Sequence, residues 1–324
     1  MKAYDDGPRL LADVGGTNAR FALETGPRSI EAVAVLRCDD FENLHAAIRA
    51  YLTQVADVVG TYGPVRHAAI AIANPVDGDV VNMVNRHWSF SVEALRAEAA
   101  LETLLVENDF AALAMALPHL DSGQCRQVGR GVGQRGRPLG LIGPGTGLGV
   151  AGLIPVGPGW APLPSEAGHA TFAPADDVEV DLLRALWNER GHVSCERLLS
   201  GSGLEAIHRV LSGSDLPAHE ITRAALDGDS AVCIEAVMRF CAILGTVAGN
   251  VALAFGATGG VYIGGGIVPR FGELFDRSPF RARFEGKGRM SSFVAPIPTY
   301  LITEKYPAFP GVSAMLAERL VSQQ

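Results

Sequence analysis

Short apolar runs alternate along this chain with segments whose apolar residues recur at helical spacing. Two apolar runs, at residues 9–14 and 19–23, flank a Gly-Gly turn and predict a strand, a tight turn and a second strand. A similar pair begins at Leu139, in the stretch LGLIGPGTGLGVAGLI. Both pairs place a glycine-rich turn with a threonine between apolar runs. This echo predicts an architecture of two similar halves.

The remaining pattern predicts an α/β protein, because strands alternate with helices throughout. Further strands are predicted at residues 68–73, 104–106 and 261–263, and helices at 41–55, 91–101, 110–117, 232–255 and 269–276. A third glycine-rich turn, residues 264–266, follows the strand at 261–263. The 324 residues suffice for two domains, since a domain usually holds roughly 100–200 residues.

The segment from Phe240 to Pro269 contains no charged residue, which is also a property of membrane-spanning helices. Its glycines and the Gly-Ala-Thr-Gly-Gly break at 256–260 favour a buried helix followed by a strand. Small residues recur at steps of three and four and so share one helix face: Ala242, Gly245, Gly249, Ala252 and Gly256. We therefore expect this face to pack closely against another element of the protein, and we expect no membrane partner.

Charge and cysteine usage point to a cytoplasmic protein without a nucleic-acid partner. The net charge is −8, and nucleic-acid binding needs clustered Lys and Arg. The one such cluster lies in a glycine-rich segment that we expect to be a solvated loop: Arg126, Arg130, Arg135 and Arg137. Five cysteines without a CxxC pair favour a reducing compartment and no structural zinc. Acidic residues and a proline replace the apolar core of a signal peptide near the N-terminus.

The three glycine-rich turns are the candidate nucleotide site. Glycine lets successive backbone N–H groups approach phosphate oxygens, which a larger side chain would block. No GxxxxGK[ST] is present, and the single GxGxxG, at residues 131–136, does not follow an apolar strand, so we regard it as a chance match. One such turn is more often ordinary turn chemistry, but three together favour ATP. Thr17 and Thr146 either offer hydroxyls to phosphate or satisfy their own turns.

Two aspartates stand where predicted strands end. Asp13 precedes the first Gly-Gly turn, where a carboxylate can hold Mg²⁺ through water, although an aspartate there can also simply initiate the turn. Asp109 is the candidate general base, because phosphoryl transfer to an alcohol needs an acceptor for the alcohol's proton. The alternative is a helix N-cap, since Asn108 and Asp109 directly precede the apolar run FAALAMAL. The two roles compete for one carboxylate.

Glu166, His169 and Glu196 are candidates for binding a polyhydroxylated ligand, because each hydroxyl can both donate and accept a hydrogen bond. Glu166 and His169 stand three apart in PLPSEAGHATFAP, and Glu196 falls in a short helical turn that we expect Gly201 to close. As isolated residues they could equally be surface carboxylates and a hydrogen-bonded histidine. A metal site of His169 with Glu166 lacks a third ligand nearby.

Six motifs, in this order, together resemble bacterial glucokinase of the hexokinase-related type. They are ADVGGTN at 12–18, ENDFAA at 107–112, GPGTGLGVA at 143–151, EAGH at 166–169, HVSCERLLSG at 192–201 and GGVYIGGGIVPR at 259–270. The resemblance extends from about Leu10 to Gly311. Ser165 and Ala167 depart from the Gly-Glu-Gly-Gly-His that the family often has, which puts loop closure and sugar affinity in question. The cysteine-rich zinc motif of repressor/kinase relatives and a preceding basic helix-turn-helix are both absent, so a sugar-responsive transcription factor is not expected.

This resemblance implies the actin-like ATPase fold, with two ribonuclease H-like α/β domains and a cleft between them. It implies a small domain of residues 1–109 plus 305–324, whose C-terminal helix crosses back to the first domain, and a large domain of residues 110–304. It also implies Asp109 as the general base, and ATP with Mg²⁺ held indirectly near Asp13. The implied sugar-binding residues are Asn108, Glu166, His169 and Glu196. The implied nucleotide-binding residues are Ala12, Asp13, Val14, Gly15, Gly16, Thr17, Gly145, Thr146, Gly147 and Gly265.

The expected activity is transfer of the γ-phosphoryl group of ATP to the 6-hydroxyl of glucose, in the cytoplasm and at the start of glycolysis. One alternative is a kinase for another hexose or an N-acetyl-hexosamine. Another is a protein without catalysis, either a sugar sensor or an actin-like filament former. A filament former would not need Glu166, His169 and Glu196 gathered together. A homodimer is common among similar proteins and is the one protein partner expected.

Overall fold

The computed structural model describes residues 3–83 and 88–322, which form two compact units. Unit 1 comprises Met1–Leu120 with Lys305–Gln324, and unit 2 comprises Asp121–Glu304. Helix α4 (Asp109–Ala116), which the sequence reading placed largely in the larger domain, is part of unit 1 because it packs along α12 (Ala308–Ser322). The C-terminal helix thus belongs with the beginning of the chain.

Unit 1 is built on a five-stranded sheet in the order β3-β2-β1-β4-β7. Its strands are β1 (Arg9–Val14), β2 (Asn18–Gly26), β3 (Ser29–Arg37), β4 (His67–Ile72) and β7 (Thr103–Asn108). Strands β1, β2 and β3 are antiparallel neighbours, whereas β1, β4 and β7 run parallel. A separate hairpin pairs β5 (Val80–Asn82) with β6 (Ser89–Ser91).

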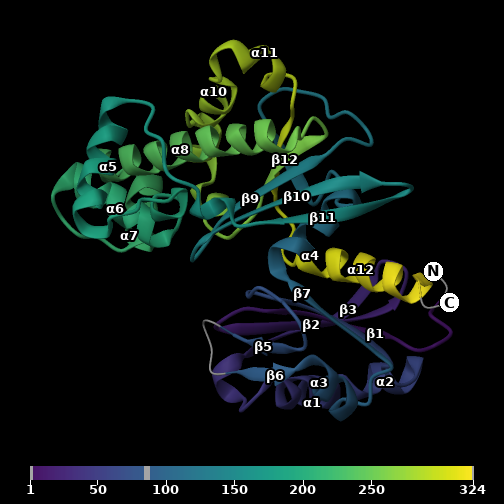
Figure 1. Cartoon of the computed structure of the whole chain (residues 1–324). Coiled ribbons are helices and arrows are strands. Elements are labelled where there is room, and N and C mark those ends of the chain that lie inside the picture. The colour runs from purple at the N-terminus through teal and green to yellow at the C-terminus, as the bar shows by residue number, and fades with distance from the viewer. Residues whose placement is uncertain (1–2, 84–87, 323–324) are drawn as a thin grey trace. The chain divides into compact units, whose positions relative to one another are not determined.

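Helices cover both faces of the unit 1 sheet, since successive residues of a strand point to opposite faces. On β1, Leu10 packs in the core beneath α1 and α3, whereas Leu11 packs against Phe309 of α12. Figure 1 shows helices α1 to α3 on one side of this sheet and α4 with α12 on the other. The bounds on the first side are α1 (Leu44–Gln54), α2 (Ala56–Tyr62) and α3 (Val92–Glu98), with short 3₁₀ turns at Cys38–Asp40 and Leu117–His119.

Unit 2 repeats this topology in a six-stranded sheet ordered β11-β10-β9-β12-β13-β8. Its strands are β8 (Cys125–Val128), β9 (Leu139–Pro144), β10 (Leu148–Val156), β11 (Gly159–Ser165), β12 (Gly260–Ile263) and β13 (Thr299–Ile302). The β11-β10-β9 meander is antiparallel and β9-β12-β13 is parallel, as in the five strands of unit 1. The prediction of two similar halves is therefore confirmed.

The extra strand β8 corrects one expectation from the sequence. Arg126 lies within this strand, paired with Leu301 of β13, and its guanidinium forms an ion pair with Asp276 at 2.6 Å. The arginine cluster is therefore not a solvated loop throughout. A short edge strand of this kind depends on pairing with a partner far along the chain, so its own sequence carries little signal.

Helix α8 (Ala231–Phe255) is the apolar helix expected at 232–255, and it is the one helix of the described chain long and apolar enough to cross a membrane. Most of its apolar stretch is buried inside unit 2. A Cβ added to Gly245 would lie 2.1 Å from the carbonyl oxygen of Phe280, the first residue of α10 (Phe280–Glu285). The predicted small-residue face is thus the contact with α10, and α8 is a core helix.

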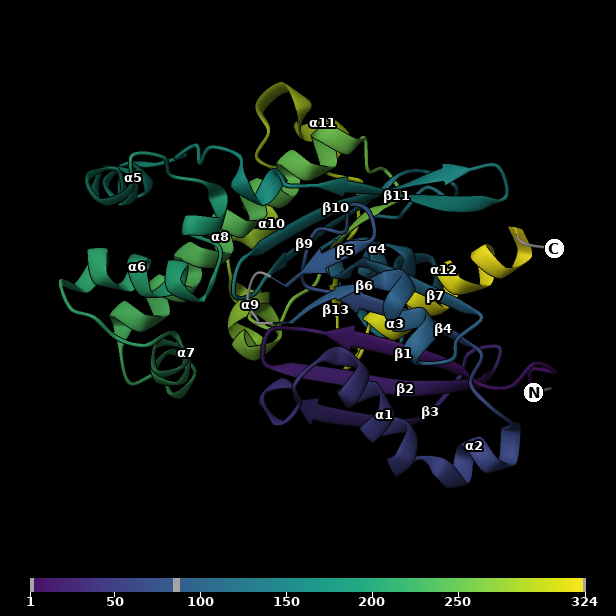
Figure 2. The ribbon, with the colours of Figure 1, turned by 60° about the horizontal axis from the view of Figure 1, so that its bottom comes forward.

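Three further helices gather beside α8 in both views of unit 2 (Figures 1 and 2). They are α5 (Asp177–Arg190), α6 (Gly201–Ser212) and α7 (Ala218–Asp227). The helix predicted at 269–276 is instead a 3₁₀ turn at Val268–Phe271 and α9 (Glu273–Arg277), separated by Gly272 at φ +51°. That left-handed glycine ends the first turn. The remaining short elements are a 3₁₀ turn at Gly288–Met290 and α11 (Ser291–Val294).

The contact between α4 and α12 generates a prediction, because it leaves no room for a side chain at Gly311. A Cβ there would lie 1.8 Å from the carbonyl oxygen of Ala112 in α4. Overpacking a tight contact typically costs about 1–3 kcal/mol. We expect Gly311→Ala to lower the free energy of unfolding by at least that amount, measured by urea denaturation.

The matched control is Gly60→Ala in α2, where an added Cβ meets nothing within 4 Å. Alanine is the better helix former, so this change should raise the free energy of unfolding by about 0.5–1 kcal/mol. Equal stability of the Gly311→Ala variant and the unaltered protein would show that α4 and α12 do not pack in this way.

Candidate functional site

In unit 1, polar residues gather where three parallel strands end. Asp13 lies one residue before the end of β1, and Asn108 ends β7, with β4 between them. The carboxyl ends of parallel strands are the usual place for ligands in α/β proteins. Ala12 and Val14 are fully buried in the apolar core, so only their backbone atoms are available for the predicted contact with a nucleotide.

Asn108, and not Asp109, caps helix α4. Its side-chain oxygen accepts hydrogen bonds from the backbone N–H groups of Phe110 and Ala111, at 3.0 and 3.1 Å. Its amide nitrogen donates to the carbonyl of Asn74 and to the Asp109 carboxylate. Asn108 therefore takes the N-cap position that the sequence also offered to Asp109, and it satisfies two N–H groups of the first turn.

Asp109 occupies the first position of α4, where its Oδ1 accepts a hydrogen bond from the N–H of Phe110 at 2.9 Å. Burial, and then the nearby charge of Asp13, raise the pKa of this carboxyl to about 6. A pKa close to the working pH is what an effective general base needs. The site thus contains a carboxylate with the proton affinity for such a role.

Arg20 is a residue of this site that the sequence reading missed. It stands directly opposite Asp13 in the β1–β2 hairpin, and its Nη1 lies 2.8 Å from Asp13 Oδ2. Burial raises the pKa of Asp13, and the Arg20 guanidinium opposes that rise. The signal was present in the sequence, because counting outward from the four residues 15–18 that separate the two apolar runs pairs position 13 with position 20.

The hairpin turns themselves leave their threonines available. Gly15 N–H donates to the carbonyl of Asn18, and Gly145 N–H donates to that of Gly147. Thr17 and Thr146 are exposed, and within residues 3–83 and 88–322 neither hydroxyl has a hydrogen-bond partner. Of the two interpretations of these threonines, the one in which they satisfy their own turns therefore does not describe this structure.

The other two glycine turns lie against each other inside unit 2. Gly264 N–H donates to the carbonyl of Ile142 on β9. Gly265 has φ +79°, and a Cβ there would lie 2.3 Å from the carbonyl oxygen of Pro144, the last residue of β9. The structure therefore brings Gly265 next to the turn at residues 145–147, and only glycine fits at this contact.

The three candidates for hydroxyl binding also lie together in unit 2. His169 Nε2 is 3.8 Å from Glu166 Oε2, and His169 Nδ1 is 3.9 Å from Glu196 Oε1. His169 and Glu196 belong to two 3₁₀ turns, Ala167–His169 and Cys195–Arg197, and Glu166 directly precedes the first turn. The Glu166 and His169 side chains are 78% and 59% exposed, so the group is open to a ligand.

Glu196 is in addition attached to the second glycine turn. Its Oε2 accepts a hydrogen bond from Leu148 N–H at 3.0 Å, and a Cβ on Gly147 would lie only 2.5 Å from that oxygen. The expectation that Gly201 closes the turn of Glu196 is wrong. Gly201 instead begins α6, and its N–H donates to the carbonyl of Gly145. Two successive contacts thus hold this loop against the turn.

The departures of this chain from the usual family loop have a structural consequence. Ser165 Oγ accepts a hydrogen bond from the N–H of Ala167 at 3.0 Å, so the serine stabilises the turn that carries Glu166 and His169. The glycine that remains, Gly168, is required, because a Cβ there would lie 2.0 Å from the carbonyl oxygen of Leu148. The loop therefore keeps its close approach to β10.

The comparisons with known proteins agree on one family. A family model described as Glucokinase matches residues 10–319. A protein named Bifunctional protein glk from Burkholderia thailandensis is 56% identical over 98% of the chain and 50% of its own length, so the chain spans about half the length of the first curated relatives it matches. A glucokinase from Chromobacterium violaceum is 54% identical over 97% of the chain and 90% of its own length.

A solved structure has the same fold. The crystal structure of a glucokinase from an Antarctic psychrotroph is 36% identical, covers 96% of this chain and 99% of that one, and has a TM-score of 0.88. The two-unit α/β architecture is that of the actin-like ATPase superfamily, as the resemblance implied. With a family model that matches nearly all of its residues, this chain belongs to the glucokinase family.

Proposed function

We propose that this protein is an ATP-dependent glucokinase, which transfers the γ-phosphoryl group of ATP to the 6-hydroxyl of glucose. The observation that carries the proposal is the state of Asp109. Its helix is capped by Asn108, and burial raises the pKa of its carboxyl to about 6. A carboxylate that is not the N-cap, and whose pKa lies near neutral pH, supports a role as proton acceptor.

In the proposed reaction, Asp109 accepts the proton of the 6-hydroxyl as that oxygen attacks the γ-phosphorus. The new bond joins the sugar oxygen to phosphorus, the bond from phosphorus to the β–γ bridging oxygen breaks, and ADP leaves. Phosphoryl transfer has little covalent chemistry for a protein to perform, so positioning and charge stabilisation supply most of the catalysis.

Glucose is the proposed sugar, and Glu166, His169 and Glu196 are its proposed hydroxyl-binding residues. Their spacing of 3.8 and 3.9 Å in an open group supports this assignment, since carboxylates and an imidazole can bond several hydroxyls. Asn108 can contribute only through its amide N–H groups, because its oxygen already accepts two hydrogen bonds from α4. Those N–H groups donate to Asn74 and Asp109 in this structure, so we propose that a sugar hydroxyl replaces one of these acceptors.

ATP is the proposed phosphoryl donor, held through its phosphates by backbone N–H groups of the glycine turns. The hydroxyls of Thr17 and Thr146, which have no hydrogen-bond partner among the described residues, support this assignment. So does the absence of a side chain at Gly145, Gly147 and Gly265. Asp13 fits a role near Mg²⁺, because it offers an oxygen ligand of the kind that ion prefers at the end of β1. When bound with ATP, Mg²⁺ would neutralise charge on the phosphates.

A cytoplasmic location and a place at the start of glycolysis are part of the same proposal. All five cysteines are free thiols, which is in keeping with a reducing compartment. A homodimer stays a prediction.

The proposal is tested by measuring ADP release in a coupled assay with glucose present or withheld. We expect release that depends on glucose. A panel of mannose, fructose and N-acetylglucosamine at fixed ATP then tests the sugar, and a higher kcat/KM for any of these would replace glucose. Sugar binding in calorimetry without any ADP release would identify a sensor instead of an enzyme.

Replacing the proposed base gives the most direct prediction. Asp109→Asn keeps an oxygen that can accept from Phe110 N–H but removes the proton acceptor, so we expect kcat to fall by a factor of about 10²–10⁴. Asp57→Asn is the control, since Asp57 is an exposed aspartate in the first turn of α2 in the same unit. Near-normal turnover of a folded Asp109→Asn variant would refute the assignment.

The pH dependence of kcat/KM for glucose gives a second prediction. The base acts in its deprotonated form, so activity should rise with pH through about 6, well above the ordinary range of an aspartate. The charge of Asp13 contributes to that raised pKa, so Asp13→Asn should move the acid limb of its residual activity to lower pH. An acid limb below about pH 5 in the unaltered protein would contradict the assigned base.

The contact between Gly147 and Glu196 gives a third prediction. A Cβ at Gly147 would collide with Glu196 Oε2 and break its bond to Leu148, and a hydrogen bond to a charged group contributes about 1.5–3 kcal/mol. We expect Gly147→Ala to raise KM for glucose by about tenfold or more. For Gly145→Ala the nearest atom is 4.0 Å away, so KM for glucose should not change. Equal KM values for glucose in the Gly147→Ala and Gly145→Ala variants would show that Glu196 does not contribute to sugar binding.

A further inference from the structure

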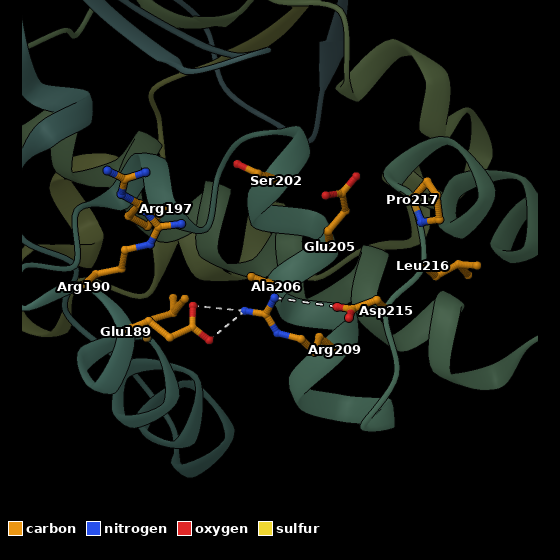
Figure 3. Close-up of a pocket in the computed structure, with 11 residues that line it drawn as sticks. Glu189, Arg190, Arg197, Ser202, Glu205, Ala206, Arg209, Asp215, Leu216 and Pro217 are labelled. Carbon is orange, nitrogen blue, oxygen red and sulfur yellow. Dashed lines mark hydrogen bonds and ion pairs between the residues drawn. The ribbon is translucent and has the colours of Figure 1, made fainter.

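A cavity of about 440 Å³ lies among the helices of unit 2, and none of the residues proposed for glucose or ATP lines it. Its walls come from the C-terminal end of α5, the 3₁₀ turn Cys195–Arg197, helix α6 and the segment at 215–217 (Figure 3). Leu186 and Ala206 form part of its apolar surface. The volume falls in the range of small-molecule sites, roughly 300–1,000 Å³.

Three arginines and three carboxylates line this cavity, but not every arginine is paired with a carboxylate. Arg209 is paired on both sides, with Glu189 at 3.0 Å and Asp215 at 3.7 Å. The guanidinium groups of Arg190 and Arg197 have no ion pair or hydrogen bond to any residue that the structure describes. Two guanidinium groups without a protein partner therefore face the same cavity.

The six charges that line the cavity sum to zero, but the two guanidinium groups without a protein partner lie together. Figure 3 shows Arg190 and Arg197 together at one end, beside Glu189, which is paired with Arg209, and Glu205 and Asp215 toward the other end. Glu205 uses one oxygen to accept from the N–H of Ala218 at 2.9 Å, which leaves its second oxygen for a ligand. The cavity thus offers donors for an anion at one end and an acceptor for hydroxyls at the other.

We propose that this pocket binds a small phosphate monoester of a polyol. The phosphate would lie on Arg190 and Arg197, whose planar groups match the geometry of phosphate oxygens. The hydroxyls would bond to Glu205 and to Ser202, whose side chain lies between Arg197 and Glu205 in Figure 3. An anion without hydroxyls would use only the arginine end and bind more weakly.

The pocket is also placed to act on the proposed sugar site, and this step rests on the proposed function. Arg197 directly follows Glu196 in one 3₁₀ turn, and α6, which forms a wall of the pocket, begins at Gly201, bonded to Gly145. A ligand that holds Arg197 would fix the turn in which Glu196 meets Leu148. The pocket is therefore an effector site that lowers KM for glucose when it is filled.

Binding is tested first, by calorimetry on the full chain with three probes. Glycerol 3-phosphate should bind, inorganic phosphate should bind more weakly, and glycerol should not bind. Arg190→Gln and Arg197→Gln should each weaken the binding of glycerol 3-phosphate at least tenfold. The control is Arg184→Gln, an exposed arginine of the same helix α5 that is paired with Asp181 at 3.2 Å, and it should leave the affinity unchanged.

Phosphates could also bind at the glycine turns assigned to ATP. The affinities of the Arg190→Gln and Arg197→Gln variants for glycerol 3-phosphate therefore show whether the probe binds in the cavity. An affinity unchanged in both pocket variants, or no binding at about 10 mM probe, would overturn the proposal. This measurement needs no catalysis, so it stands even if the kinase activity is refuted. A KM for glucose that does not change at saturating glycerol 3-phosphate would overturn the effector role.

Discussion

The candidate site of unit 1 depends on how the amide of Asn108 is used. The first turn of α4 leaves backbone N–H groups without helical partners, and a side chain must satisfy them. Asn108 accepts from two of them and is the N-cap, so Asp109 stands at the first helical position, where only its Oδ1 accepts from Phe110 N–H. A helix N-terminus favours the charged form of an acid, but here burial and Asp13 outweigh that effect and raise the pKa to about 6.

The position of that carboxylate depends in turn on the far end of the chain. Helix α12 lies along α4 at a distance that only glycine permits at position 311, where a Cβ would overlap the carbonyl of Ala112. Phe309 and Val312 of α12 complete the same apolar cluster on the unit 1 sheet. A residue in the C-terminal helix can therefore alter a site formed by residues 13 and 109 without touching either.

Much of this architecture could be predicted from local pattern, and the failures have a common cause. The strands at 9–14 and 139–144 were predictable because apolar runs stop at glycine turns, and α8 was predictable within one residue because Ser230 caps its start and Gly256 ends it. Strand β8 and the break at Gly272 were not predicted, since the first needs β13 as a partner and the second needs a backbone conformation that periodicity does not reveal.

The candidate site shows the same division between local and distant information. The residue types at 109, 166, 169 and 196 could be selected from sequence chemistry and the family motifs, and the β1–β2 register could also have given Arg20 opposite Asp13. The sequence could not show that Asn108 rather than Asp109 is the N-cap of α4, or that Glu196 accepts a hydrogen bond from Leu148 N–H. Both depend on which backbone N–H groups a side chain meets after folding.

Glu196 illustrates why this matters for interpreting substitutions. One of its oxygens faces His169, and the other accepts from the turn at residues 145–148, so one carboxylate serves both the proposed sugar group and the proposed phosphate turn. Removing the whole side chain would disturb both groups at once, and the result would not separate a sugar contact from a structural one. Glu196→Gln retains an oxygen that can accept from Leu148 while removing the negative charge. The isosteric change is therefore the one that reports on the charge, whereas an alanine at this position would report on the turn as well.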